Sequence, residues 1–212
     1  MIARILLFIK HHLPWLWHIV EWLNTRLFRV LHQDRMQQQI AQAFEKFKLD
    51  GFKFRPLNAD DLDHLHDLIQ RQGSERLKFF QPHGFDKRNL RKAHANPAFF
   101  MFGVFREEEM VGYFFLRCFW NRKCFVGRLI DEPFEGQGIG RVMNDIMYHI
   151  AWWSIFRCFT TVSKNNTSVI RSHSRNPHVK VADLLSGDYL LLEFLELTDK
   201  DQNEALRHNE RG

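Results

Sequence analysis

The residues best suited to do chemistry are three glycines within five positions, in Gly136-Gln137-Gly138-Ile139-Gly140. They lie between a strand-like apolar run and a strongly amphipathic helical pattern. Glycine lets the backbone approach a ligand closely and adopt positive φ, and a helix start offers unpaired N–H groups and the positive end of the helix dipole. Together these features predict a pyrophosphate-binding loop. The alternative is a tight strand-to-helix turn that binds no ligand.

Two other phosphate-binding motifs do not fit this segment. The dinucleotide fingerprint requires a third glycine where Arg141 stands, and it requires a βαβ unit. The strands expected before the loop form an antiparallel meander instead. A P-loop requires Gly-Lys followed by Ser or Thr, which is absent here. The loop therefore indicates another class of phosphate-bearing ligand.

Hydrophobic periodicity and turn residues predict the elements that position this loop. In chain order we expect helices within 1–50, a strand at 52–55, helices at 58–69 and 86–94 joined by a loop at 73–85, strands at 99–106, 110–120 and 124–130, a helix at 138–153, a strand at 156–162, a short polar helix at 165–175 and a strand at 189–197. This mixture predicts an α+β fold around one mixed sheet.

The loop and its neighbours resemble the GNAT superfamily of N-acyltransferases, whose loop reads Gln/Arg-x-x-Gly-x-Gly/Ala between the fourth core strand and the third core helix. Gly138 and Gly140 occupy its two small positions, and Glu135 stands where Gln or Arg is usual. The resemblance covers about residues 52–197 and implies a GNAT-like mixed central sheet flanked by helices. It also implies binding of acetyl-CoA, or another acyl-CoA, mainly through backbone amides. The implied cofactor contacts are Ile130, Gln137, Gly138, Ile139, Gly140, Arg141, Asn165 and Asn166.

The same resemblance implies an acid after the fifth core strand. The family carries an asparagine there and, seven residues later, a tyrosine that can protonate the leaving thiolate. Counting from Asn166 leads to His173, and counting from Asn165 leads to Ser172; neither position is a tyrosine. We expect His173 to be the acid, with Ser172 as the alternative. The alternative without a catalytic role is that His173 is an ordinary surface histidine on a polar helix.

A base must remove a proton from the acceptor ammonium. Asp131 and Glu132 follow the fourth core strand, close to where the acyl group should lie, and either could act directly or through water. The alternative is that they form a solvated turn. A backbone N–H near Ile130 is expected to polarise the thioester carbonyl, as an oxyanion hole does.

Aromatic residues are the candidates for acceptor binding. We expect Phe80, His83, Phe85 and Trp120 to contact a sugar or base, although such aromatics are more often core residues. A net charge of +5 favours an anionic partner. The expected acceptor is a small-molecule amine, such as a nucleotide-linked amino sugar of surface-polysaccharide synthesis, with a peptide or small amine as alternatives. Without a run of Lys and Arg, nucleic acid is not expected.

The N-terminal region is expected to form a helical extension at 1–50, followed by the acyltransferase domain at 51–197 and a polar tail at 198–212. Its apolar runs, 2–9 and 13–23, fall short of the ~20 residues needed to span a bilayer. Tryptophans at 15, 17 and 22 favour membrane interfaces, so residues 1–33 could lie on an anionic membrane surface. Alternatively, they pack on the domain or on a second copy in a homodimer.

The cysteines and the lack of a signal cleavage site predict the compartment. Cys118, Cys124 and Cys158 lie in apolar runs without metal-ligand spacing, which indicates reduced thiols and no metal site. We expect a cytoplasmic protein, with contact to the inner face of the membrane as an option. The rival from another class is a non-catalytic acyl-CoA-binding or membrane-docked interaction module, which the missing tyrosine and Glu135 favour.

Overall fold

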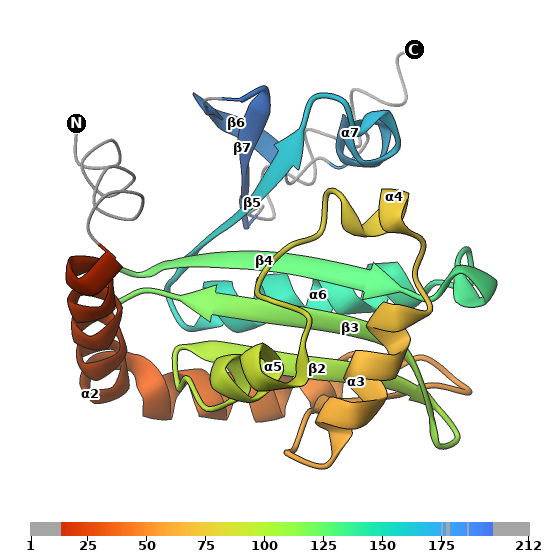
Figure 1. The fold of residues 1–212 in the computed structure, drawn as a ribbon, viewed down its shortest axis with the longest axis horizontal. Coiled ribbons are helices and arrows are strands. Elements are labelled where there is room, and N and C mark those ends of the chain that lie inside the picture. The colour runs from red at the N-terminus through yellow and green to blue at the C-terminus, as the bar shows by residue number, and fades with distance from the viewer. Residues whose placement is uncertain (1–13, 175, 177–178, 186, 197–212) are drawn as a thin grey trace.

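The computed structural model describes residues 14–174, 176, 179–185 and 187–196. In this part of the chain seven strands form one sheet in the order β1-β2-β3-β4-β5-β7-β6 (Figure 1). Neighbouring strands are antiparallel except β4 and β5, which are parallel. The strands are β1 Lys53–Pro56, β2 Phe99–Arg106, β3 Glu109–Cys118, β4 Lys123–Ile130, β5 Arg157–Ser163, β6 Val179–Leu185 and β7 Tyr189–Phe194. The predicted α+β class and mixed sheet are confirmed.

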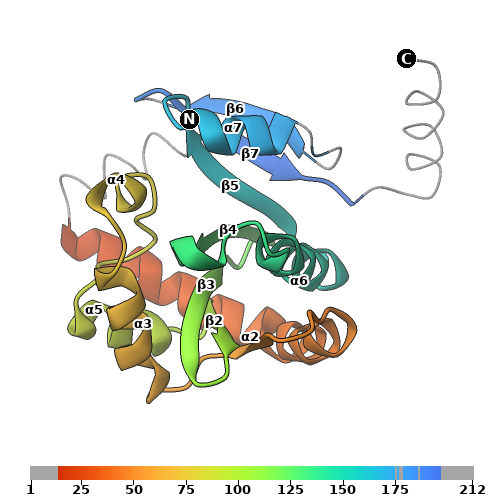
Figure 2. The same ribbon diagram turned by 90° about the vertical axis from the view of Figure 1, so that its right-hand side faces the viewer.

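Helices cover both faces of the sheet, and each face has its own core. Helices α3 (Asp61–Gln70) and α5 (Lys87–His94) lie on one face, and α2 (Pro14–Lys46) and α6 (Ile139–Trp153) lie on the other (Figure 2). Because side chains of a strand alternate between faces, Tyr113 and Phe115 of β3 join the first core, while Phe114 and Leu116 join the second. The shorter helices are α4 Ser74–Leu77, the 3-10 helix η1 Glu132–Phe134 and α7 Thr167–Ser174.

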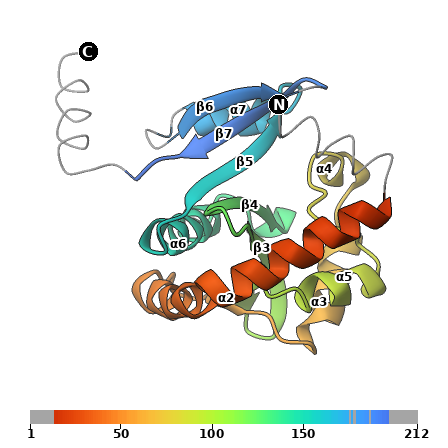
Figure 3. The same cartoon turned by 90° about the vertical axis from the view of Figure 1, so that its left-hand side faces the viewer.

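Helix α2 is one continuous helix of 33 residues that is built into the domain. It begins at Pro14, a position where the missing N–H of proline is tolerated. It crosses one face of the sheet toward α6 (Figure 3) and buries Phe28, Met36 and Ile40 in the core. One face of α2 therefore packs on the domain, as one of the two readings of this region expected, while residues 1–13 lie outside the described part. Within that part, no helix has the length and apolar character needed to cross a membrane.

Three elements differ from the sequence prediction. Strand β6 was not predicted, because its residues are exposed apart from the half-buried Val179 and show no apolar alternation. Helix α4 forms within the predicted loop 73–85. The last strand ends at Phe194 rather than continuing to residue 197.

Candidate active site

The glycine loop has the backbone conformation that its sequence predicts. Gly136 and Gly138 have φ values of 76° and 85°, a region that residues with side chains rarely adopt. Gly138 is the N-cap of α6, so the free N–H groups of the first helical turn follow it directly. The loop therefore presents backbone donors at the positive end of the α6 dipole, as a pyrophosphate site requires.

Arg128 of β4 lies directly beneath this loop. Its Nε donates to Asn144 Oδ1 at 2.9 Å, and a Cβ added to Gly140 would stand 2.6 Å from its Nη1. Burial lowers the pKa of Arg128 because desolvation disfavours the charged guanidinium. No ion pair to Arg128 is found among the described residues. A half-buried positive charge thus adds to the helix dipole, and an anion above the loop would neutralise both.

The sheet splits between β4 and β5, next to the loop. These strands pair only through Lys123–Phe125 and Arg157–Phe159, and Figure 2 shows β5 turning away from β4 beyond that point. Buried, unoxidised Cys124 and Cys158 face each other in this paired segment, beside the third buried cysteine, Cys118. Past it, the facing edges 126–130 and 160–163 are unpaired. Such edges offer N–H and C=O groups to an amide-bearing ligand laid between them.

A cavity of about 770 Å³ occupies this split and is lined from both faces of the sheet. Phe80 and Phe115 line it from the α3 side, and Met147 and Tyr148 line it from the α6 side. A second cavity of about 960 Å³ lies along α6 and the glycine loop, and it shares Arg128, Ile130 and Tyr148 with the first. The arrangement suits a long ligand that enters at the loop and reaches through the sheet.

Tyr148 is a residue of this site that the sequence pattern did not reveal. Its ring stacks on Phe194 with centroids 4.2 Å apart, and burial raises its pKa far above the usual value. It therefore remains a hydroxyl donor throughout the physiological range. No hydrogen bond to that hydroxyl is found in the described part of the chain. The one feature of the sequence that could have pointed to Tyr148 is its spacing of seven residues from Arg141, which places the two residues on the same side of α6.

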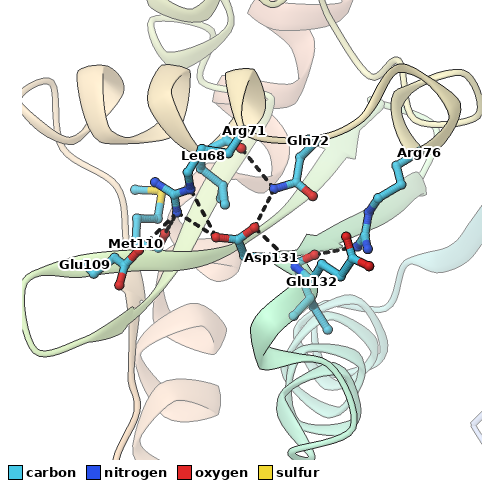
Figure 4. A network of polar contacts seen from close by, with 9 residues as sticks. Leu68, Arg71, Gln72, Arg76, Glu109, Met110, Asp131 and Glu132 are labelled. Atoms are coloured by element: carbon cyan, nitrogen blue, oxygen red, sulfur yellow. Dashed lines mark hydrogen bonds and ion pairs between the residues drawn. The ribbon is translucent and has the colours of Figure 1, made fainter.

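Asp131 is held by a network that joins α3 to the end of β4 (Figure 4). Arg71 donates to its Oδ2 through Nε and Nη2 at 3.1 and 2.9 Å, and Gln72 donates to Oδ1 at 2.8 Å. The Glu132 N–H also donates to Oδ1, at 3.2 Å. Asp131 is buried, and it lines neither cavity. The geometry therefore argues against the predicted role as base and favours a role in positioning the loop.

We expect Asp131→Asn to lower the free energy of unfolding by about 1.5–3 kcal/mol, the usual value of a hydrogen bond to a charged group. Arg71→Gln should cause a similar loss, and the double variant should lose less than the sum, because both changes break one ion pair. Denaturant unfolding measures all three. A normally stable Asp131→Asn protein with kcat reduced about 10²-fold or more would restore Asp131 as the base.

Glu135 departs from the family pattern, and Arg76 of α4 is its partner. Arg76 Nη2 donates to Glu135 Oε1 at 2.5 Å and to the Ile130 carbonyl at 2.7 Å. This contact ties α4 to the loop and to the end of β4. Glu135 and Glu75 are the carboxylates among the described residues that line the cavity in the split. Either is better placed than Asp131 to receive a proton from an amine.

The structure brings only one of the four predicted aromatic residues to the cavity, and that residue is Phe80. His83 packs in the core of the α3 face, where Nδ1 contacts the Gly84 carbonyl at 3.0 Å and Nε2 contacts the Tyr113 hydroxyl at 2.8 Å. The neutral tautomer with its proton on Nδ1 satisfies both contacts, because Nδ1 then donates to the carbonyl and Nε2 accepts from the hydroxyl. Burial lowers the pKa of His83, which favours this neutral form. Phe85 packs in the same core. The structure therefore places His83 and Phe85 against this core and not in the lining of either cavity.

Trp120 was also assigned to the acceptor site, but it lines neither cavity. It lies at the hairpin between β3 and β4, where its backbone N–H donates to Asn24 Oδ1 of α2 at 3.1 Å. Its carbonyl contacts His32 Nε2 at 2.9 Å. Trp120 therefore lies beside α2, at the opposite end of β4 from the glycine loop.

The remaining predicted residues lie in different parts of the structure. Ile130 and Arg141 line the cavity along α6, whereas the buried Ile139 side chain leaves only its backbone for a ligand. Glu132, Gln137 and Asn165 are exposed and line neither cavity, although Gln137 donates to the Pro133 carbonyl. Asn166 lines the cavity in the split and accepts from the Val169 N–H. Ser172 and His173 belong to α7, but their side chains lie outside the described part.

Comparison with known proteins identifies the fold. No protein-family model and no curated protein matches the chain. Among solved structures, PaiA N-acetyltransferase from Thermoplasma acidophilum in complex with coenzyme A superposes with a TM-score of 0.56 and 15% identity, covering 68% of this chain and 99% of that one. The GNAT domain of S. lividans PAT gives 0.57 and 14%, covering 66% and 88%. RimL, a ribosomal L7/L12 alpha-N-protein acetyltransferase, gives 0.54 and 20%, covering 68% and 88%.

These likenesses establish the class of fold. The chain has the fold of the GNAT N-acetyltransferases. The predicted GNAT-like sheet is thereby confirmed.

Proposed function

We propose that this protein is an N-acyltransferase that moves an acetyl or other short acyl group from acyl-CoA to a primary amine. The observation that carries the proposal is the cavity through the split sheet, with the glycine loop at one of its mouths. Two substrates could meet there from opposite faces. PaiA and a second RimL structure, both of this fold, were solved in complex with coenzyme A.

The residues present fit acyl-CoA. The loop amides and Arg128 would hold its pyrophosphate, because both place positive charge at the α6 start. The free edge of β4 would pair with the pantetheine amides, leaving a backbone N–H near Ile130 for the carbonyl oxygen. When bound, acyl-CoA supplies an activated thioester. The new C–N bond then forms as the C–S bond breaks, one proton leaves the amine, and the thiolate gains a proton.

The acceptor would enter on the face that bears α4. Phe79, Phe80 and Pro82 form an apolar wall there, and Glu75 and Glu135 offer carboxylates for the amine proton. Aromatic faces stack well on sugars and bases, so we propose a nucleotide-linked amino sugar as acceptor. RimL's own substrate makes a peptide α-amine the second candidate.

Turnover of acetyl-CoA tests this proposal. We expect free thiol to appear only when an acceptor is present, and mass spectrometry should show an acetylated amine. The panel should contain a nucleotide-linked amino sugar, the same nucleotide with a neutral sugar, a short peptide and a polyamine. If acetyl-CoA raises the melting temperature but no amine is acetylated, the protein is instead a non-catalytic acyl-CoA-binding module.

We expect Arg128→Met to raise the Kd for CoA about 10–100-fold. The reason is the loss of a charge-assisted contact in a partly desolvated site. Arg141→Gln is the matched control, because that arginine also lines the cavity but is exposed; it should raise Kd only a few-fold. Calorimetric titration measures both. Equal effects of the two changes would show that Arg128 does not contact the pyrophosphate.

A further inference from the structure

Helix α2 has two different solvent faces along its length, although its buried face is continuous. Asn24, Phe28, Met36 and Ile40 face the domain throughout. From residue 19 to residue 31, the opposite face is apolar and uncovered, whereas from residue 34 onward it is polar. The uncovered residues, which we call the apolar stripe, are Ile19, Trp22, Leu23, Leu27, Val30 and Leu31.

Exposure in the stripe is large for such residues. Val30 is 82% exposed and Trp22 is 57% exposed. Trp120 adds to this surface from the β3–β4 hairpin and is 51% exposed, held against α2 by the contacts to Asn24 and His32. Contiguous apolar surface of this kind, on a protein whose core is already complete, indicates a site of association.

The exposed charges around the stripe are mainly basic, with one exposed acidic residue, Asp34, directly after it. The exposed charged residues within it are Arg26 and Arg29, and the acidic Glu21 is engaged by Arg117. The adjoining hairpin adds exposed Arg122 and Lys123. Helix α5, with four Lys or Arg in eight residues, ends beside α2, where Thr25 donates to Asn96 Oδ1 at 3.3 Å. An anionic partner would complement this rim.

We propose that the apolar stripe docks the protein on the surface of an anionic lipid bilayer, with the N-terminal part of α2 that carries the stripe parallel to the membrane plane. Apolar and tryptophan side chains would enter the headgroup boundary, and the basic rim would contact lipid phosphates. The other face of α2 is packed in the domain, so the helix can lie on the bilayer without unfolding.

This orientation leaves the candidate active site accessible. Trp120 precedes β4 and the glycine loop follows it, so strand length separates them by about 25 Å. The docking surface and the glycine loop therefore lie near opposite ends of β4. Docking is independent of the proposed acyl transfer, and its test needs no enzymatic readout.

Co-sedimentation with vesicles tests the proposal. The full chain should bind vesicles of equal parts phosphatidylglycerol and phosphatidylcholine, bind pure phosphatidylcholine at least about tenfold more weakly, and lose binding at high salt. Trp22→Gln/Leu27→Gln/Val30→Gln should reduce binding about tenfold or more, since it removes exposed apolar surface from the stripe. Arg26→Gln/Arg29→Gln should reduce binding only to the anionic vesicles.

The control changes the polar half of the same helix. Gln38→Ser/Gln42→Ser alters exposed residues outside the stripe and should bind like the unaltered protein. Circular dichroism confirms that each variant is folded. Failure of the unaltered protein to bind either vesicle, or full binding by the triple variant, would overturn the proposal. A dimer that the triple variant converts to a monomer would show that the stripe joins two copies instead.

Discussion

Gly138→Val is expected to abolish measurable CoA binding, a loss of at least about 100-fold in affinity, while the domain remains folded. Gly138 has φ of 85° and caps α6, so a β-branched residue there would force the backbone out of the left-handed region. The donors of the first helical turn would then no longer converge on the pyrophosphate. The nearest atoms to an added Cβ are those of Leu49, at 3.9 Å, so steric conflict with the core is small.

Gly51→Val is the matched control for this change. Gly51 has a similar φ of 80°, open space around its Cβ position and no place in either cavity. It should reproduce the backbone strain, and any loss of stability, without affecting CoA affinity. Calorimetric titration and thermal unfolding of both variants separate strain from binding. Normal CoA binding by Gly138→Val would mean that the loop is only a turn.

The loop and the sheet could be predicted because their signals are local. Glycines between a strand and an amphipathic helix specify both a conformation and a chemistry. The apolar face of α6, with Ile139, Met143 and Ile146, repeats at helical spacing and is buried as predicted. The meander likewise follows from short turns between apolar runs.

The site residues were harder to predict because they meet through tertiary structure. Arg128 looks like an ordinary charged residue of a strand until α6 places Asn144 and Gly140 above it. Asp131 stands next to the loop in sequence, yet its carboxylate turns to Arg71, 60 residues away. The sequence around His83 and Trp120 does not indicate whether these side chains face a cavity, a core or another helix.

Removal of the acid that protonates the thiolate is expected to have the next largest effect. The described backbone of α7 follows β5, and Asn166 and Val169 at its start line the cavity in the split. His173 comes one helical turn after Val169, a spacing that places both positions on the same side of a helix. His173→Ala should therefore lower kcat about 10²–10⁴-fold, the usual contribution of acid catalysis, with little change in CoA affinity.

The pH dependence distinguishes His173 from its competitors. An acid must be protonated to act, so kcat should fall as pH rises through the titration of that acid, and His173→Ala should lack this limb. Ser172→Ala tests the other spacing, and Tyr148→Phe tests a donor that burial keeps protonated and that would produce no such limb. If the kcat of His173→Ala stays within a few-fold of the unaltered enzyme and the fall at high pH remains, His173 is not the acid. The role then belongs to the residue, Ser172 or Tyr148, whose variant loses activity. If all three remain active, positioning the amine beside the thioester suffices, and water carries the proton.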